Sequence, residues 1–130
     1  MKLLQQKPQH NHVLAIAERV KQKFPSSKGQ CEFMAKELVA SLKKAGIRAN
    51  HVMGNFHLDE PGAYDYLSPA DGEEQDDYIV NHDWVTVEGK ILDISASQFR
   101  QYVNQEIPEI VFISYTDPLH NHYEELGYVE

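Results

Sequence analysis

The sequence contains only one cysteine, Cys31, in its 130 residues. An intramolecular disulfide is therefore excluded. A single cysteine in an intracellular chain that also carries histidines is a candidate nucleophile. The alternative is a buried, inert thiol, because free cysteine is among the most buried residue types. The residues that surround Cys31 decide between these two interpretations.

Long apolar runs and an excess of basic residues are also missing. No segment approaches the roughly 20 apolar residues that span a bilayer, and residues 1–4 are followed by polar residues where a signal peptide would need its apolar stretch. Twenty acidic against twelve basic residues give a formal charge of -8, which repels a phosphate backbone. We therefore expect a cytoplasmic protein that binds neither nucleic acid nor a membrane.

The size and the 42% hydrophobic content predict one domain over residues 1–130, built on one core. Residues 1–9 and 118–130 show little periodicity and are expected to be flexible or peripheral. Residues 59–77 are rich in proline, glycine and acidic side chains, which predicts a long surface loop. A loop of this length could border a cleft or could be a solvated insertion.

Apolar spacing predicts two helices in the first part of the chain. The first covers about residues 11–23 and ends before Pro25, and the second begins near Cys31 and stops at Gly46. Cys31 then lies in the first turn of its helix. Unpaired backbone N–H groups and the helix dipole favour a thiolate over a thiol at that position.

Strand patterns follow the helices. Residues 47–58, 78–88, 90–94 and 109–115 alternate or run apolar as strands do, and residues 95–102 predict a short helix. Helices first and neighbouring strands afterwards predict an α+β fold, with N-terminal helices packed on an antiparallel β-sheet.

The predicted hairpin brings a histidine and an aspartate together. If Glu88 and Gly89 form a two-residue turn, the register places Trp84 opposite Asp93. His82 then shares a sheet face with Asp93 and lies diagonal to it, within reach of its side chain. A carboxylate beside an imidazole selects one tautomer and stabilises the imidazolium.

Cys31, His82 and Asp93 together supply the three roles of a thiol-based catalytic triad. Free cysteine is mostly protonated at neutral pH, and a positioned histidine can take its proton and later return it to a leaving group. The chain order places the nucleophile at a helix start and its partners on adjacent strands. The order alone does not show contact between Cys31 and the sheet.

Three segments resemble the transglutaminase-like superfamily, which has a papain-like fold. Residues 28–35 (KGQCEFMA) resemble its Gly-x-Cys helix start, and residues 82–85 (HDWV) look like its His-x-Trp-Val strand. Residues 91–99 (ILDISASQF) are similar to the Asp-containing strand end and Gln-Phe ending of small bacterial and phage members. The resemblance implies Cys31 as nucleophile, with the histidine as general base and acid and the aspartate as orienting carboxylate.

An acyl-transfer site also needs donors for an oxyanion. The backbone N–H of Cys31 is one candidate, and Gln30 or Asn81 could add a side-chain donor. Trp84 could form a wall of the cleft over the histidine, or could simply belong to the core. Asp83 faces the opposite side by parity and is expected at the surface.

Two histidine pairs offer a rival metal site. They could bind a transition metal if the two ends of the chain met. His10 and His12 would diverge at the start of a helix, and the tail pair, His120 and His122, has no cysteine, aspartate or glutamate at a recognised spacing. We therefore expect no metal and no other cofactor.

The leading hypothesis is a cysteine hydrolase or acyltransferase that acts on an amide or thioester of a peptide or protein substrate. A cysteine protease and a glutamine deamidase or transglutaminase are its plainest examples. The alternative is a non-catalytic binding or regulatory module that uses the loop at 59–77 to engage a basic partner. The acidic residues of that loop are Asp71, Glu73, Glu74, Asp76 and Asp77.

Overall fold

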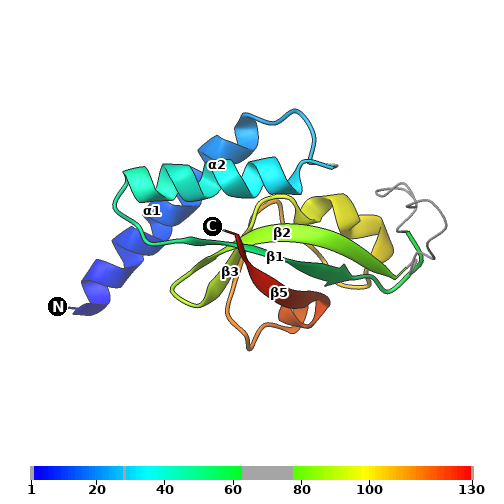
Figure 1. Cartoon of the computed structure of the whole chain (residues 1–130). Helices are drawn as coiled ribbons and strands as arrows, with labels where there is room; N and C mark the ends of the chain where they lie inside the picture. Colours follow the sequence, from blue (N-terminus) through cyan, green and yellow to red (C-terminus); the bar gives the residue numbers. More distant parts are fainter. Residues whose placement is uncertain (1, 28, 63–77, 130) are drawn as a thin grey trace.

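The computed structural model describes residues 2–27, 29–62 and 78–129 (Figure 1). The acidic residues at 71–77, on which the binding-module hypothesis depends, lie outside the described residues. The elements are α1 (Lys2–Gln22), α2 (Cys31–Lys44), β1 (Asn50–His57), β2 (Ile79–Val87), β3 (Lys90–Asp93), the 3-10 helix η2 (Ala96–Tyr102), β4 (Val111–Ile113), the 3-10 helix η3 (Pro118–His122) and β5 (Tyr123–Val129).

The strands form one antiparallel sheet in the order β4-β3-β2-β1-β5. The two α-helices pack on one face, where their apolar stripes meet Val85 and Leu92 (Figure 1). The other face carries a second apolar cluster, centred on Phe56 and Phe99. This arrangement confirms the predicted α+β class. No helix in the described part of the chain has the length and apolar content that a membrane crossing requires.

Helix α1 begins nine residues earlier than predicted and runs through Pro8. Residues 2–9, expected to be flexible or peripheral, have a helical backbone. Apolar periodicity marks only the part of a helix that packs on the core, and among the described side chains of α1 the first buried one is Val13. Leucine, glutamine and lysine are good helix formers and extend a helix that packing has already nucleated.

Helix α2 agrees closely with its prediction. It begins at Cys31, and its buried stripe of Met34, Ala35, Leu38 and Leu42 faces the sheet. Gly46 follows its end with a φ of +79°, a left-handed conformation that suits glycine.

The hairpin between β2 and β3 has the predicted register. Glu88 and Gly89 both adopt positive φ, at 53° and 76°, as a type I′ turn requires. Val87 pairs with Lys90, and the ladder continues only as far as Val85 opposite Leu92. Beyond that pair β3 separates from β2, one residue before Trp84 and Asp93 would meet.

The C-terminal segment, expected to be flexible or peripheral over residues 118–130, forms the 3-10 helix η3 and the edge strand β5 of the sheet over residues 118–129. Strand β5 pairs with β1 along the edge of the sheet, and Tyr123 at its start is buried. The segment was missed because only Tyr123 of β5 is buried, so its apolar and polar residues do not alternate as they do in a half-buried strand. Strand β4 is also shorter than the predicted strand over residues 109–115.

Candidate active site

His82 and Asp93 form a buried ion pair between β2 and β3. The Nε2–H of His82 donates to Oδ2 of Asp93 at 2.6 Å, and the two side chains are 0% and 1% exposed. The diagonal placement inferred from the hairpin therefore brings these two residues together. A carboxylate in this position fixes the tautomer of the ring and stabilises its protonated form.

Asp93 has hydrogen-bond donors on both oxygens. Oδ1 accepts from the backbone N–H of Ser95 at 2.9 Å and from its hydroxyl at 3.2 Å. Oδ2 accepts from His82 and also from the hydroxyl of Tyr123 at 2.7 Å. Four donors hold the carboxylate in one orientation. Tyr123 was not found from the sequence, because it belongs to the strand that was expected to be a tail.

The pair shifts the proton affinity of each member. Burial lowers the pKa of His82, but the charge and hydrogen bond of Asp93 outweigh burial and raise it to about 10. Burial raises the pKa of Asp93, but the His82 charge and the donors around it lower the pKa below its usual 3.8. At neutral pH the site therefore holds an imidazolium beside a carboxylate.

Cys31 approaches the imidazole from the first turn of α2. Its side chain is partly exposed, and by hydrogen bonding and charge it raises the pKa of His82. The Nδ1 of His82 is buried and makes no well-formed hydrogen bond to any described residue. The thiol is thus the group of the site with which Nδ1 of His82 can interact.

The thiol and the imidazole come from opposite faces of the sheet. The His82 ring lies against Phe56 and Phe99, whereas α2 packs on the other face. Cys31 interacts with His82 past the end of the β2–β3 ladder. Cys31 and Asp93 line one void there, which is too narrow for a water molecule. The site therefore lies at the end of the β2–β3 ladder.

A recess of about 250 Å³ opens beside the thiol. Its lining comes from the start of α2, from β2 and from η2. The side chains that bear on the chemistry are Cys31, Asn81, Asp83 and Gln98. A reacting carbonyl could reach the sulfur from this recess.

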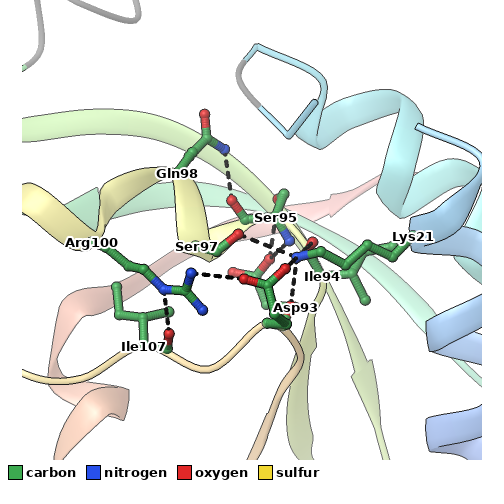
Figure 2. A network of polar contacts seen from close by, with 9 residues as sticks. Lys21, Asp93, Ile94, Ser95, Ser97, Gln98, Arg100 and Ile107 are labelled. Atoms are coloured by element: carbon green, nitrogen blue, oxygen red, sulfur yellow. Dashed lines mark hydrogen bonds and ion pairs between the residues drawn. The ribbon is translucent and has the colours of Figure 1, made fainter. Parts of the chain in front are cut away.

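Polar contacts tie the helix start to the segment that follows Asp93. Gln98 accepts from the backbone N–H of Gly29 at 3.3 Å and donates to the carbonyl of Ser95 at 3.0 Å. Lys21 of α1 donates to the carbonyl of Ile94 at 2.9 Å (Figure 2). It also pairs with Glu109. These bonds hold the thiol and the carboxylate on one rigid frame.

The other candidate residues take mixed positions. Gln30 caps α2 without a side-chain hydrogen bond to it, and Asn81 is exposed at the recess. Trp84 lies near His82, at 5.9 Å between ring centroids, but it is 2% exposed and belongs to the core. The expectation that Asp83 lies at the surface is wrong, since it is half-buried and accepts a hydrogen bond from His51.

The two histidine pairs have separate surroundings. His10 stacks on Phe112, whereas the Nδ1–H of His122 donates to the carbonyl of His57 at 2.6 Å. In the described part of the chain, no three histidine, cysteine, aspartate or glutamate side chains gather as metal ligands would. The geometry thus gives the metal hypothesis no support.

Comparison with known proteins assigns no family to this chain. No family model, no curated protein and no solved structure matches the chain. The arrangement of Cys31, His82 and Asp93 is therefore the feature of the chain that bears on its function.

Proposed function

We propose that the protein is a thiol-dependent hydrolase or acyltransferase of the transglutaminase-like, papain-like type. Its substrates are amides or thioesters of peptides or proteins. The observation that carries this proposal is the buried His82–Asp93 pair, whose imidazole also interacts with the thiol of Cys31. Structural ion pairs also occur in cores, but a purely structural pair has no need of a partly exposed thiol next to it.

Cys31 is the nucleophile of the proposed reaction. Its sulfur attacks the carbonyl carbon, and the imidazolium of His82 gives its proton to the leaving amine or thiol as the carbonyl carbon's bond to that group breaks. A thioester to Cys31 remains. Water or an amine then attacks the thioester while His82 accepts the incoming group's proton, and the sulfur leaves.

Asp93 acts through His82. Its carboxylate holds the ring through Nε2, so that Nδ1 points to the side where the thiol lies, and it stabilises the imidazolium. The backbone N–H of Cys31, at the first position of α2, is free of an intrahelical partner and can donate to the oxyanion.

Alkylation of the native protein with iodoacetamide tests this proposal. We expect Cys31 to react at least tenfold faster than a cysteine in a model peptide, because the thiolate is the reactive form and the imidazolium stabilises it. His82→Gln should remove the excess rate. His57→Gln is the matched control, since His57 is exposed and pairs with Glu124 at the surface.

Circular dichroism and urea unfolding should establish that both variants are folded before rates are compared. Cys31→Ser should abolish labelling and also the hydrolysis of a small thioester. A native rate no greater than that of the peptide would contradict the proposal, as would a fast rate that His82→Gln leaves unchanged.

A further inference from the structure

Asp83 follows His82 on β2 and faces the other side of the sheet. Alternation along the strand places it on the face of Val85, which packs beneath α2, whereas the ring of His82 lies against Phe56. The side chain of Asp83 is only 15% exposed. Together with Cys31 it lines both the narrow void beneath α2 and the recess beside the thiol. A carboxylate therefore lies where a substrate would approach the sulfur.

A buried histidine holds this carboxylate from the neighbouring strand. His51 of β1 is paired with Val85, so it lies diagonal to Asp83. Its Nε2–H donates to Oδ2 of Asp83 at 2.5 Å, and its own side chain is 6% exposed. One such donor uses only part of a carboxylate, whose two oxygens can accept about four hydrogen bonds. His51 therefore restricts the orientation of Asp83 and leaves it able to bind a further donor.

Packing gives no reason for a charge at this position. Val85, the next residue on the same face of β2, is apolar and fully buried. Removing a carboxylate from water costs free energy, and apolar residues of similar volume in place of a buried ion pair are often just as stabilising. The Asp83–His51 pair is therefore better explained by what Asp83 can bind than by the stability of the fold.

The recess beside the thiol has an acidic lining. Its charged members are Asp83 and Glu32, and none of the described residues that line it is a lysine, an arginine or a histidine. Phe33, which is 59% exposed, adds an aromatic ring. Carboxylates and aromatic faces both attract an ammonium or a guanidinium group. The recess measures about 250 Å³, less than the roughly 300–1,000 Å³ of a pocket for a drug-sized ligand, so it suits a single side chain.

We propose that Asp83 selects peptide substrates with a lysine or arginine side chain on the residue that carries the reacting carbonyl or on the one before it. This inference rests on the proposed function and names the class of substrate that the site prefers. The cationic group pairs with Asp83 in the recess while the carbonyl lies at Cys31. An acidic side chain in the same place is repelled by Asp83 and Glu32.

Peptide chloromethyl ketones that differ in one charge test this proposal. Acetyl-dialanyl-lysine chloromethyl ketone and its norleucine analogue both alkylate a thiol, and norleucine keeps the stem of lysine without the ammonium group. A second pair of probes carries the lysine or norleucine one residue before the ketone. In one of the two pairs the lysine probe should label Cys31 about tenfold faster at neutral pH, the scale of one hydrogen bond to a charged group. This ratio should decline as salt is added, because salt screens a partly exposed ion pair.

The protein side is tested with Asp83→Asn. Asparagine removes the charge and keeps an oxygen that can accept from His51. The ratio of lysine-probe to norleucine-probe labelling should then fall close to one. Because both rates are measured on the same sample, a change in the reactivity of the thiol itself cancels in the ratio.

Glu18→Gln is the matched control. It removes one negative charge from an exposed position on α1, outside the recess, and should leave the ratio as it is in the native protein. If Asp83→Asn does not fold, the ratio in the native protein and its dependence on salt still decide the question.

Two failures are distinguishable. Iodoacetamide labelling that does not depend on His82 overturns the proposed function, whatever the probes show. Labelling that depends on His82 leaves the proposed function standing. In that case, equal rates for lysine and norleucine in both pairs overturn the role of Asp83, as does a ratio that Asp83→Asn leaves unchanged.

Discussion

His82 and Tyr123 bind the same oxygen atom of the Asp93 carboxylate. The imidazole donates to Oδ2 at 2.6 Å and the phenol donates at 2.7 Å. All three side chains are at most 9% exposed. The oxygen is buried, and both donors stabilise the negative charge of the Asp93 carboxylate. That charge in turn strengthens each of the two hydrogen bonds. The C-terminal strand thus takes part directly in the charge balance of the site.

Tyr123→Phe should raise the pKa of Asp93, because a carboxylate that loses a hydrogen-bond donor is less stabilised in its charged form. The ring of Tyr123 packs against Phe56 and Trp84, and phenylalanine keeps those contacts. The carboxyl carbon of Asp93, followed by NMR during an acid titration, reports the shift.

The matched control is Tyr128→Phe, in the same strand but exposed. It should leave the Asp93 titration where it is in the native protein. If acid unfolding hides the titration, urea unfolding at a series of pH values gives the same information, since the acid loss of stability in Tyr123→Phe should begin at higher pH. Equal behaviour of the two variants would show that the phenol does not act on Asp93.

The His82–Asp93 pair predicts a stability maximum in weak acid. The raised pKa of His82 contributes stability that is complete below the ordinary value of 6.5 and is lost as the pH rises through about 10. The lowered pKa of Asp93 contributes stability that is present above the ordinary value of 3.8 and is lost as the pH falls through the folded value. The free energy of unfolding from urea titrations should therefore peak between about pH 4 and 6.5.

Asp93→Asn tests whether the His82–Asp93 pair, and not other titrating groups, causes the loss of stability above pH 6.5. Removing one partner of a buried ion pair costs about 3–5 kcal/mol, because the imidazole must either stay charged without compensation or give up its proton on folding. His82 should then be neutral in the folded variant, and the decline in stability between pH 6.5 and 10 should become shallower. A decline that is just as steep in the variant would assign it to groups other than His82.

Much of the sheet and its catalytic candidates could be predicted from local patterns. The Glu88–Gly89 turn sets a register, and that register alone places His82 next to Asp93, so two residues eleven positions apart could be joined from the sequence. The start of α2 at Cys31 followed from apolar spacing and the Gly46 stop.

The remaining parts of the site depend on long-range packing. Tyr123 reaches Asp93 because β5 pairs with β1, a contact between strands about 70 residues apart that no local pattern encodes. The approach of Cys31 to His82 depends on where β3 leaves β2, and the end of a ladder has no turn signal of its own. The α1 start was missed for the opposite reason, since helix can extend beyond the residues that touch the core.

Gly54 permits the close packing behind the histidine. It lies on β1 directly opposite His82, at a register irregularity against β5. A Cβ at this position would come closer than 3.0 Å to the carbonyl oxygen of Glu124 and to the Trp84 ring. A backbone carbonyl cannot turn aside as a flexible side chain can, so glycine is required here for close approach rather than for an unusual φ.

Gly54→Ala should therefore displace either β5 or the Trp84 ring, and it should destabilise the fold by about 1–3 kcal/mol, the usual cost of overpacking. Trp84 is the only tryptophan of the chain, so a shift of its fluorescence toward longer wavelength in the folded variant would report the displacement directly. Gly127→Ala is the control, because no atom lies within 4 Å of the added Cβ although Gly127 belongs to the same strand pair. If both variants unfold at the same urea concentration as the native protein and keep its fluorescence emission, β5 and Trp84 do not pack over Gly54. The placement of Tyr123 at Asp93, which depends on the position of β5, would then be wrong as well.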